Sequence, residues 1–294
     1  MPEILVISGK GGTGKTSLTG AFAHLAQDPV ICDLDVDAPD LHLLLDPAAE
    51  RTEEFFFGHH AVIDPELCTS CGLCLEMCRY QAIANLERPP AVDERRCEGC
   101  KVCAHFCPAQ AIAFPERHCG RWYISSTRFG PLVHAQLFPG QENSGRLVAL
   151  LRQQAKQLAR SQGRNLILCD GAPGIGCPVI SSLSGVDLAV AVTEPTPSGR
   201  HDLERVVELC AHFRVPAAVI INKHDLNDEQ SGLIERYCAR EGLPLLAKLP
   251  HDPAFVRAML AGRVVTEQEN GGLAELIEDA WRAIVALAGQ KQAA

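Results

Sequence analysis

The chain has 294 residues, which at about 150 residues per domain corresponds to two domains, although a single large α/β domain would also fit. Hydrophobic residues make up 47% and charged residues 21% of the chain, and these ordinary fractions exclude intrinsic disorder and a fibrous repeat. The net charge of −9 argues against a surface that coats nucleic acid.

The first predicted element is a buried strand over residues 3–8, a short apolar run that leads directly into a glycine-rich loop. A helix over 15–27 and a second strand over 30–33 follow. Residues 33–40 combine a proline with several aspartates, which favours a turn. Strand, glycine loop, helix and strand in this order indicate the start of a doubly wound α/β fold.

Two cysteine runs, which form an internal repeat, interrupt this pattern between about His59 and Trp122. After them, alternating strands and helices predict a mostly parallel sheet covered on both faces. The predicted strands there are 165–169, 188–193, 217–222 and 243–249, and the predicted helices are 144–161, 200–213, 228–240 and two C-terminal ones. We therefore expect a discontinuous α/β domain over 1–59 and 118–294, with a small α+β domain inserted over 60–117.

Residues 9–16 match the phosphate-loop pattern G-x-x-x-x-G-K-[ST] in the required context, with a strand before and a helix after. Backbone N–H groups and the helix N-terminus can then cradle phosphate oxygens. Lys15 is expected to reach the β- and γ-phosphates, and the Thr16 hydroxyl to hold Mg²⁺. The expected phosphate-binding residues are Gly9, Gly11, Gly12, Thr13, Gly14, Lys15, Thr16 and Ser17. The alternative is a glycine turn with incidental lysines.

A second lysine, Lys10, lies within the loop and completes the pattern K-G-G-x-G-K-[ST]. This pattern resembles the deviant phosphate-loop ATPases, the family of MinD, ParA, Mrp-type carriers and the nitrogenase iron protein. The resemblance implies that Lys10 crosses a dimer interface to touch the nucleotide of the partner subunit. It therefore implies a homodimer that forms on ATP binding, or a heterodimer with a similar ATPase. A solvated loop lysine is the alternative.

Two further segments resemble the same family. Asp33-Leu34-Asp35 resembles the first switch, which implies that Asp35 positions the attacking water and that Asp33 supports the Mg²⁺ shell. Asp170 with residues 171–174, at the end of an apolar strand, resembles the Walker B aspartate and the second switch, which implies that Gly174 offers its N–H to the γ-phosphate. A carboxylate at the carboxyl end of a strand beside the phosphate loop is also where a metal shell needs negative charge. The expected catalytic residues are Lys10, Lys15, Asp35 and Asp170.

The nucleotide base is expected to be adenine. Asn222 follows a predicted strand and resembles the adenine-contacting asparagine of these ATPases, with Pro250 on the second wall. Residues 222–225 also match the N-K-x-D pattern of GTPases, so guanine stays open as a minority alternative. The phosphate loop and both switch segments favour ATP.

Eight of the 14 cysteines lie between Cys68 and Cys107 and form two C-x-x-C-x-x-C-x-x-x-C runs. The runs resemble those of bacterial ferredoxins, in which the fourth cysteine of each run ligates the other cluster, and this implies two [4Fe–4S] clusters per chain. The implied ligands are Cys68, Cys71, Cys74 and Cys107 for cluster one and Cys97, Cys100, Cys103 and Cys78 for cluster two. Zinc explains neither the third nor the fourth cysteine of a run. One departure is Arg79, which stands where the usual pattern has proline.

The other cysteines have weaker claims to function. We expect Cys32, Cys119, Cys169, Cys210 and Cys238 to be buried. Cys177 lies on the second switch, where it is either an interface thiol or a metal ligand that bridges two subunits. His134 is expected to be an internally bonded histidine, and Ser144 a helix cap.

Taken together, these features predict an ATP-hydrolysing dimeric switch that couples nucleotide state to electron transfer, or to iron–sulfur or metallocofactor assembly on a partner protein. The alternative is a positioning ATPase of the MinD/ParA kind with a structural or redox-sensing ferredoxin module. The acidic charge balance and the acidic C-terminal helix predict no nucleic-acid partner and no stable membrane attachment. The sequence shows neither a secretory signal nor a long apolar segment, so a cytoplasmic location is expected.

Overall fold

The computed structural model describes residues 1–84, 89–141, 145–268 and 271–290, without the side chain of residue 290. The chain divides into two compact units. The larger unit comprises Met1–Glu53, Trp122–Gln136 and Asn143–Ala294, and the smaller unit comprises Glu54–Arg121 and Leu137–Glu142. None of the described helices is long and apolar enough to cross a membrane.

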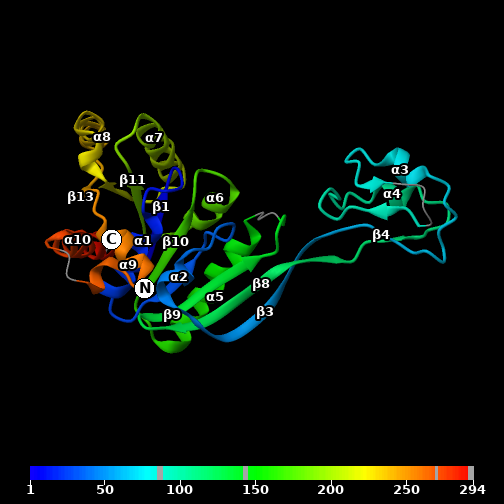
Figure 1. The fold of residues 1–294 in the computed structure, drawn as a ribbon, viewed down its shortest axis with the longest axis horizontal. Helices are drawn as coiled ribbons and strands as arrows, with labels where there is room; N and C mark the ends of the chain where they lie inside the picture. The colour runs from blue at the N-terminus through cyan, green and yellow to red at the C-terminus, as the bar shows by residue number, and fades with distance from the viewer. Residues whose placement is uncertain (85–88, 142–144, 269–270, 291–294) are drawn as a thin grey trace. The chain divides into compact units, whose positions relative to one another are not determined.

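The larger unit is built on a sheet with the strand order β13-β12-β11-β1-β10-β2-β9-β8-β3 (Figure 1). These strands are β1 (Glu3–Ser8), β2 (Val30–Asp33), β3 (Ala48–His59), β8 (Glu116–Thr127), β9 (Gly130–Leu137), β10 (Ile167–Pro173), β11 (Leu188–Thr193), β12 (Ala217–Asn222) and β13 (Leu245–Leu249). All neighbours from β13 to β9 pair in parallel, and the alternating sequence pattern predicts this for the strands from β13 to β2. The carboxyl ends of β1, β2 and β10 therefore meet at one edge, where ligands bind in open α/β sheets.

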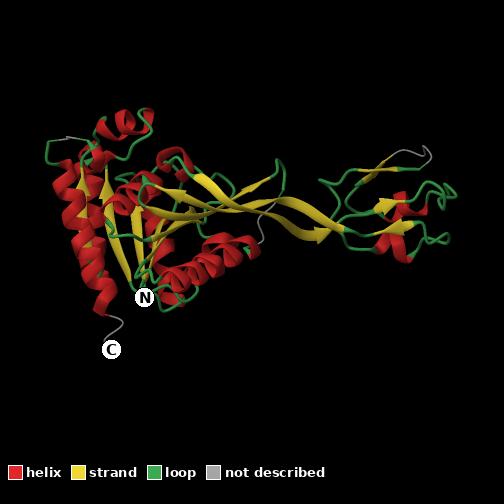
Figure 2. Cartoon of the chain, turned by 90° about the horizontal axis from the view of Figure 1, so that it is seen from below, coloured by secondary structure: helices red, strands yellow, loops and turns green. Residues whose placement is uncertain are grey.

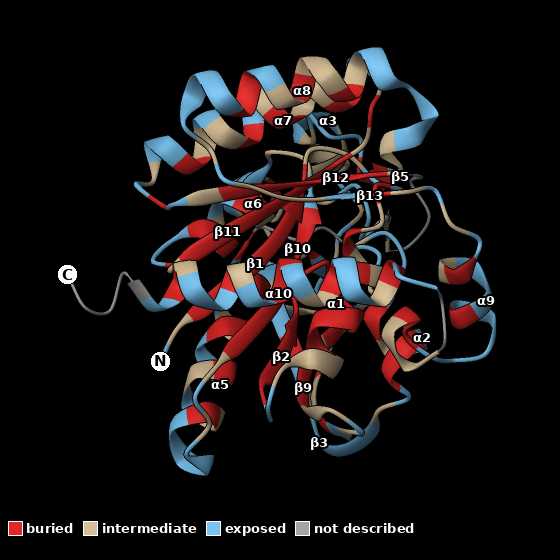
Figure 3. Ribbon diagram, turned by 90° about the vertical axis from the view of Figure 1, so that its left-hand side faces the viewer, coloured by how far each residue is buried: buried red, intermediate tan, exposed pale blue. Residues whose placement is uncertain are grey.

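Helices cover both faces of this sheet, and Figure 3 shows the central strands buried between them. The helices are α1 (Lys15–Leu25), α2 (Leu41–Leu45), α5 (Arg146–Gln162), α6 (Cys177–Leu183), α7 (Pro197–His212), α8 (Asp228–Glu241), α9 (Ala254–Leu260) and α10 (Leu273–Gln290), with short 3₁₀ turns at His224–Leu226 and Val265–Glu267. On one face Ile4 and Val6 of β1 join a core cluster with α1 and α10. Within that cluster the rings of Phe22 and Trp281 stack with centroids 5.4 Å apart.

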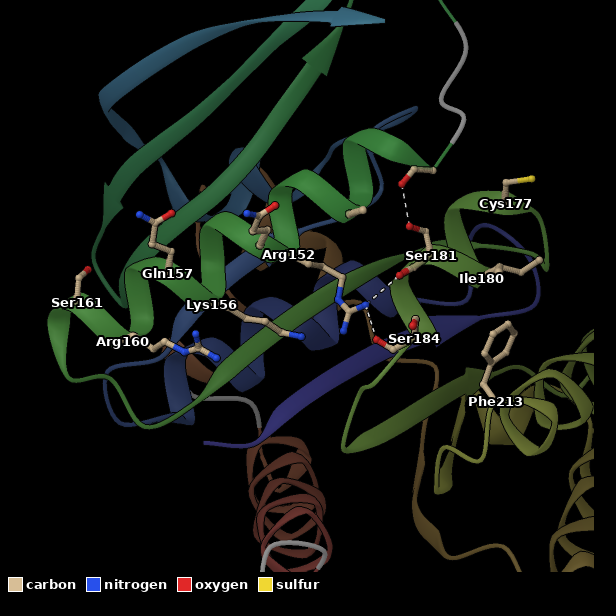
Figure 4. A pocket seen from close by; sticks show the side chains of 13 residues that line it. Arg152, Lys156, Gln157, Arg160, Ser161, Cys177, Ile180, Ser181, Ser184 and Phe213 are labelled. Carbon is tan, nitrogen blue, oxygen red and sulfur yellow. Dashed lines mark hydrogen bonds between the residues drawn. The ribbon is translucent and has the colours of Figure 1, made fainter.

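A buried ion pair fixes α5 on the other face. The Arg152 guanidinium donates from Nε to Glu3 Oε1 (2.6 Å). From Nη1 it donates to the carbonyl oxygens of Ser181 (2.9 Å) and Ser184 (2.8 Å), as Figure 4 shows. Lys156 lies 2.8 Å from the second oxygen of Glu3. The pair thus joins β1, α5 and the end of α6, beside a cavity of about 1130 Å³.

Replacing Arg152 with methionine is expected to lower the free energy of unfolding by about 3 kcal/mol, because the substitution leaves a buried carboxylate with one cation fewer and two carbonyls unbonded. The change would be measured by urea denaturation. Arg257 supplies the control, since its side chain is 64% exposed and lies 3.9 Å from Asp252. Arg257→Met should change stability by less than about 0.5 kcal/mol. Equal effects of the two substitutions would contradict the role given to Arg152.

The smaller unit includes residues 54–59 of β3 and 116–121 of β8, and its other elements are short (Figure 2). They are β4 (Val62–Ile63), α3 (Leu73–Met77), β5 (Ile83–Ala84), β6 (Ala91–Val92), α4 (Val102–His105) and β7 (Ile112–Ala113). Strand β4 pairs antiparallel with β7, and β5 with β6. The buried core cluster that the described residues form here is only Ala61, Ile63, Ile83 and Cys103, and cysteines make up much of the layer packed against it. A core of this size contributes little stability without a metal or disulfides.

The sequence pattern missed three long strands, β3, β8 and β9, and two helices, α2 and α6. Residues 48–59 and 116–137 form β3, β8 and β9, although the pattern there indicated no strands. Strand β3 was missed because it is polar and exposed for most of its length, so its side chains show no apolar alternation. The strand predicted over 165–169 instead covers Ile167–Pro173, and the segment from Cys177, where no helix was predicted, is a helix of 7 residues.

Helix α7 begins earlier than the predicted boundary at Arg200. Pro197 occupies its first turn, and the Thr196 hydroxyl caps it by accepting from the N–H of Gly199 (2.9 Å). Threonine followed by proline is a recognised helix start, so this signal was present in the sequence. The predicted cap at Ser144 lies outside the described residues, and Gly145 precedes the first residue of α5.

His134 is internally bonded, as predicted: its Nε2 lies 2.9 Å from the Ser125 hydroxyl, and its ring stacks on Tyr123. Burial, with a smaller contribution from His42, lowers the pKa of His134 to about 4. Because this value is below that of an unfolded histidine, the unfolded chain binds a proton first as the pH falls. Stability should therefore be lost between about pH 6.5 and pH 4.

Replacing His134 with asparagine is expected to remove about 2 kcal/mol of the stability difference between pH 7 and pH 5, because asparagine does not titrate. The measurement is urea denaturation of both proteins at a series of pH values. Parallel pH profiles for the two proteins would show that His134 does not carry this dependence.

Candidate functional sites

The phosphate loop connects the end of β1 to the start of α1. Gly12 and Gly14 have φ angles of 80° and 90°, in the left-handed region that favours glycine. A Cβ on Gly14 would lie 2.4 Å from the amide nitrogen of Asn222, and one on Gly9 would lie 2.3 Å from the Cβ of Asp202. Glycine is therefore required at Gly9 and Gly14 because other parts of the chain approach the loop closely.

Lys15 lies at the centre of the candidate nucleotide site, with only 6% of its side chain exposed. Its Nζ is 2.9 Å from Asp170 Oδ2 and 3.5 Å from Asp35 Oδ2. Burial by itself lowers the pKa of the Lys15 ammonium, but the carboxylates of Asp170 and Asp35 outweigh it and raise that pKa above its ordinary value. Lys15 is therefore charged, and it holds two of the predicted catalytic carboxylates beside the loop.

Asp170 is buried and bonded through both of its oxygens. The Thr16 hydroxyl donates to Oδ2 (2.7 Å), and the Thr19 hydroxyl donates to Oδ1 (2.8 Å). The sequence analysis did not single out Thr19, although it lies one helical turn after Thr16 on the same face of α1, which is the signal that could have found it. The two threonines fix the carboxylate where the Walker B resemblance places it.

Asp33 carries a buried carboxyl oxygen without a partner. Its Oδ1 accepts from the N–H of Asp35 (3.1 Å), whereas its buried Oδ2 has no hydrogen-bond partner within the described ranges. Burial and then the Asp170 carboxylate raise the pKa of the Asp33 carboxyl well above its ordinary value, and burial raises the pKa of Asp35 to about 6. An orphaned carboxylate oxygen beside Thr16 and Asp170 is a donor set suited to Mg²⁺.

Lys10 points back into its own chain. Its Nζ lies 2.6 Å from Glu194 Oε1, at the end of β11. The other oxygen of Glu194 lies 3.0 Å from Nζ of Lys223, which also donates to the carbonyl of Gly12 (2.8 Å). No motif in the sequence indicated Glu194, because the two lysines that it pairs lie far from it in the chain.

The remaining predicted nucleotide residues lie around the loop. The Asn222 amide donates to the carbonyl of Thr13 (2.8 Å), and the N–H of Gly174 donates to the carbonyl of Ser8 (2.9 Å). Both groups are thus engaged within the protein here, so a contact of Asn222 with adenine, or of Gly174 with phosphate, requires rearrangement. Pro250 is half-buried in the loop after β13.

In the smaller unit, the eight clustered cysteines line two separate cavities. Around one cavity lie Cys68, Cys71, Cys74 and Cys107, and around the other lie Cys78, Cys97, Cys100 and Cys103. These are the two interleaved sets that the ferredoxin resemblance implies. Across the described residues, no three His, Cys, Asp or Glu side chains converge closely enough to hold a metal ion in this structure.

Backbone N–H groups point at four of these sulfurs. The N–H of Ala82 donates to Cys78 Sγ (3.3 Å) and that of Ala111 to Cys107 Sγ (3.4 Å), at the same offset in each half of the repeat. Ser70 and Ala61 donate in the same way to Cys68 and Cys97, both at 3.4 Å. Hydrogen bonds of this kind stabilise negative charge on sulfur, as cluster ligands require.

The other six cysteines divide as predicted. Those expected to be buried are so: Cys32, Cys119, Cys169, Cys210 and Cys238. Cys177 is exposed at the start of α6. The bridging metal role considered for Cys177 stays a prediction.

The CobQ/CobB/MinD/ParA nucleotide binding domain matches residues 4–265, which span most of the chain and include the site around Lys15. The chain belongs to this family. Uncharacterized protein MJ0578 of Methanocaldococcus jannaschii is 36% identical over 229 residues, which cover 77% of this chain and 79% of that protein. Uncharacterized protein MJ0579 of the same organism is 24% identical over 260 residues, 82% of this chain and 92% of that protein.

Solved structures of the MinD/ParA type share the fold. MinD from Pyrococcus horikoshii in complex with Mg-ADP is similar with a TM-score of 0.59 and 17% identity, covering 99% of this chain and 98% of that one. MinD in the MinC:MinD complex from Aquifex aeolicus has a TM-score of 0.56 and 18% identity, covering 97% of this chain and 96% of that one. The predicted α/β fold and family are thus confirmed, and the inserted ferredoxin domain is not tested by these similarities.

Proposed function

We propose that the larger unit binds ATP with Mg²⁺ at the phosphate loop and hydrolyses it as a nucleotide-dependent switch of the MinD/ParA type. One observation carries this proposal. The ammonium of Lys15 is surrounded by Thr16 of α1, Asp35 of the loop after β2 and Asp170 of β10, which meet at the carboxyl edge of the sheet. Such a group can position a triphosphate and an attacking water.

The ion pairs in this structure indicate which contacts ATP binding would change. The phosphates would replace Asp170 and Asp35 as partners of the Lys15 ammonium, and the Asp35 carboxylate would then be free to orient water. Thr16 and the unpartnered oxygen of Asp33 would hold Mg²⁺, which neutralises charge on the phosphates. The N–H of Gly174 would exchange the carbonyl of Ser8 for a phosphate oxygen.

The proposed switch pairs two subunits. Lys10 is the residue that the family resemblance assigns to the partner's nucleotide, so ATP would favour a homodimer, or a heterodimer with a similar ATPase. MinD from Aquifex aeolicus occurs in a complex with MinC, which makes a second protein partner reasonable for this chain as well. We expect that partner to be a redox or cofactor-assembly protein.

The smaller unit is proposed to hold two [4Fe–4S] clusters. Support comes from the cysteines around its two cavities, the N–H groups aimed at four sulfurs and the small apolar core. Bound clusters would supply reversible one-electron chemistry and would also cross-link a unit too small to be stable by burial alone. Arg79, whose guanidinium lies 5.3 Å from the centroid of the Tyr80 ring, would place positive charge in this unit.

Two functions are candidates for the whole chain, in which the ATPase unit and the cysteine unit are joined. The family and fold similarities favour a MinD/ParA-like positioning ATPase in which the cysteine unit is structural or senses redox state. The second function, delivery of electrons or clusters to a partner, is favoured by the eight cysteines around two cavities, since two adjacent clusters are typical of electron carriers. Of these two functions we favour the MinD/ParA-like ATPase.

Two measurements on the anaerobic protein together separate these functions: a redox titration monitored by EPR, with and without Mg-ATP, and the ATPase rate of the oxidised and the reduced protein. Cluster potentials that ATP shifts, with an ATPase rate that depends on cluster reduction, would indicate electron delivery. A rate that responds to reduction, with potentials insensitive to ATP, would indicate redox sensing. Purified holoprotein that neither binds nor hydrolyses ATP would overturn the ATPase proposal itself.

A further inference from the structure

Lys10 has no free hydrogen-bond donor in this structure. A lysine ammonium has three N–H groups. Lys10 Nζ lies 2.6 Å from Glu194 Oε1, 3.1 Å from the Thr196 hydroxyl and 3.1 Å from the Ser198 hydroxyl. All three acceptors belong to the same chain, so Lys10 cannot bind another group without leaving at least one of them.

Glu194 is also tied to the phosphate loop on its other side. Its Oε2 accepts from Lys223 (3.0 Å), and Lys223 donates to the carbonyl of Gly12 (2.8 Å). Although burial opposes it, hydrogen bonds from Lys10 and Lys223 hold the pKa of the Glu194 carboxyl below its usual range. The carboxylate is therefore charged at neutral pH, and it binds two cations beside the loop.

We propose that Glu194 is a positioning residue that keeps Lys10 inside its own subunit until a second nucleotide-bound subunit competes for it. This inference rests on the proposed function, in which Lys10 reaches the nucleotide of the partner. Glu194 then makes dimer formation less favourable, because the Lys10 of each subunit must break a charge-assisted hydrogen bond before it can reach the partner. Two such bonds are lost when two identical subunits pair.

Replacing Glu194 with glutamine should tighten the dimer formed with Mg-AMPPNP, since the amide keeps the shape of the side chain but not its charge. The half-buried pair predicts about a 5-fold effect per subunit, and thus about a 25-fold lower dimer dissociation constant. The constant would be measured by sedimentation equilibrium on the anaerobic holoprotein. Glu235→Gln is the matched control, since Glu235 pairs with Lys248 on the surface at 3.2 Å, and it should leave the constant unchanged.

A double-mutant cycle with Lys10→Met separates this role from a purely structural one. If Glu194 acts through Lys10, the tightening caused by Glu194→Gln disappears in the Lys10→Met background. Equal tightening in both backgrounds, or weaker nucleotide binding without tightening, would overturn the inference. Ser198→Ala, which removes one acceptor of Lys10, should tighten the dimer in the same direction and tests the idea if Glu194→Gln fails to fold.

Different results would overturn the ATP-dependent pairing and the role of Glu194. Wild-type protein that stays monomeric with Mg-AMPPNP overturns both the paired switch and the role of Glu194. Wild-type protein that pairs, together with a Glu194→Gln variant that pairs no more tightly, overturns only the role of Glu194.

Discussion

Replacing Lys15 with methionine is expected to lower the rate of ATP hydrolysis by at least about 100-fold and to abolish detectable ATP binding. Lys15 is the buried cation of the candidate site, and its ammonium is the group around which the two switch carboxylates gather. Methionine keeps most of the volume of the side chain but offers the phosphates no charge and no donor. Binding would be followed with a fluorescent ATP analogue, and hydrolysis by phosphate release.

Lys248→Met provides a matched control, because Lys248 is a lysine with 44% of its side chain exposed in a surface ion pair. It should bind and hydrolyse ATP like the wild type. Circular dichroism must show that Lys15→Met remains folded, since the substitution leaves Asp170 and Asp35 without their cation. Normal hydrolysis by a folded Lys15→Met protein would place the nucleotide somewhere other than the phosphate loop.

The parts of the fold that could be predicted were those with a local pattern in the sequence. Strand β1 is apolar at nearly every position and ends in a phosphate loop, so the strand, the loop and the start of helix α1 follow from residues 3–16 alone. The parallel direction of the strands from β13 to β2 follows from alternating strands and helices. Strand β3 carries no such pattern, because it is polar and exposed and is specified by its neighbour in the sheet.

The candidate site divides in the same way. Lys15, Thr16 and Asp170 were identified because a motif or a strand end marks them, and the structure brings them together. Glu194 was missed since its importance comes from two lysines, Lys10 and Lys223, that lie near it only in the folded chain. The motifs thus marked the groups proposed to act on phosphate, but not Glu194, which is proposed to hold Lys10.

The iron content of cysteine variants of the smaller unit should depend on which cysteines share a cluster. The cavities group Cys68 with Cys107 and set Cys78 in the other cavity, so the sets are interleaved along the chain. The anaerobic holoprotein should contain about eight iron atoms per chain. Replacing Cys68 and Cys107 together with alanine should remove about four, because both serve one cluster. Replacing Cys68 and Cys78 together should remove all eight.

A sequential arrangement, in which each run of four cysteines holds its own cluster, reverses these two outcomes. The pair Cys68 and Cys78 would then cost about four iron atoms, and the pair Cys68 and Cys107 would cost all eight. Cys177→Ala is the control, since this thiol is exposed and lies outside both cavities, and it should leave the iron content at about eight. Iron analysis of the unmodified protein and of the three variants therefore decides both whether the clusters exist and which cysteines share a cluster.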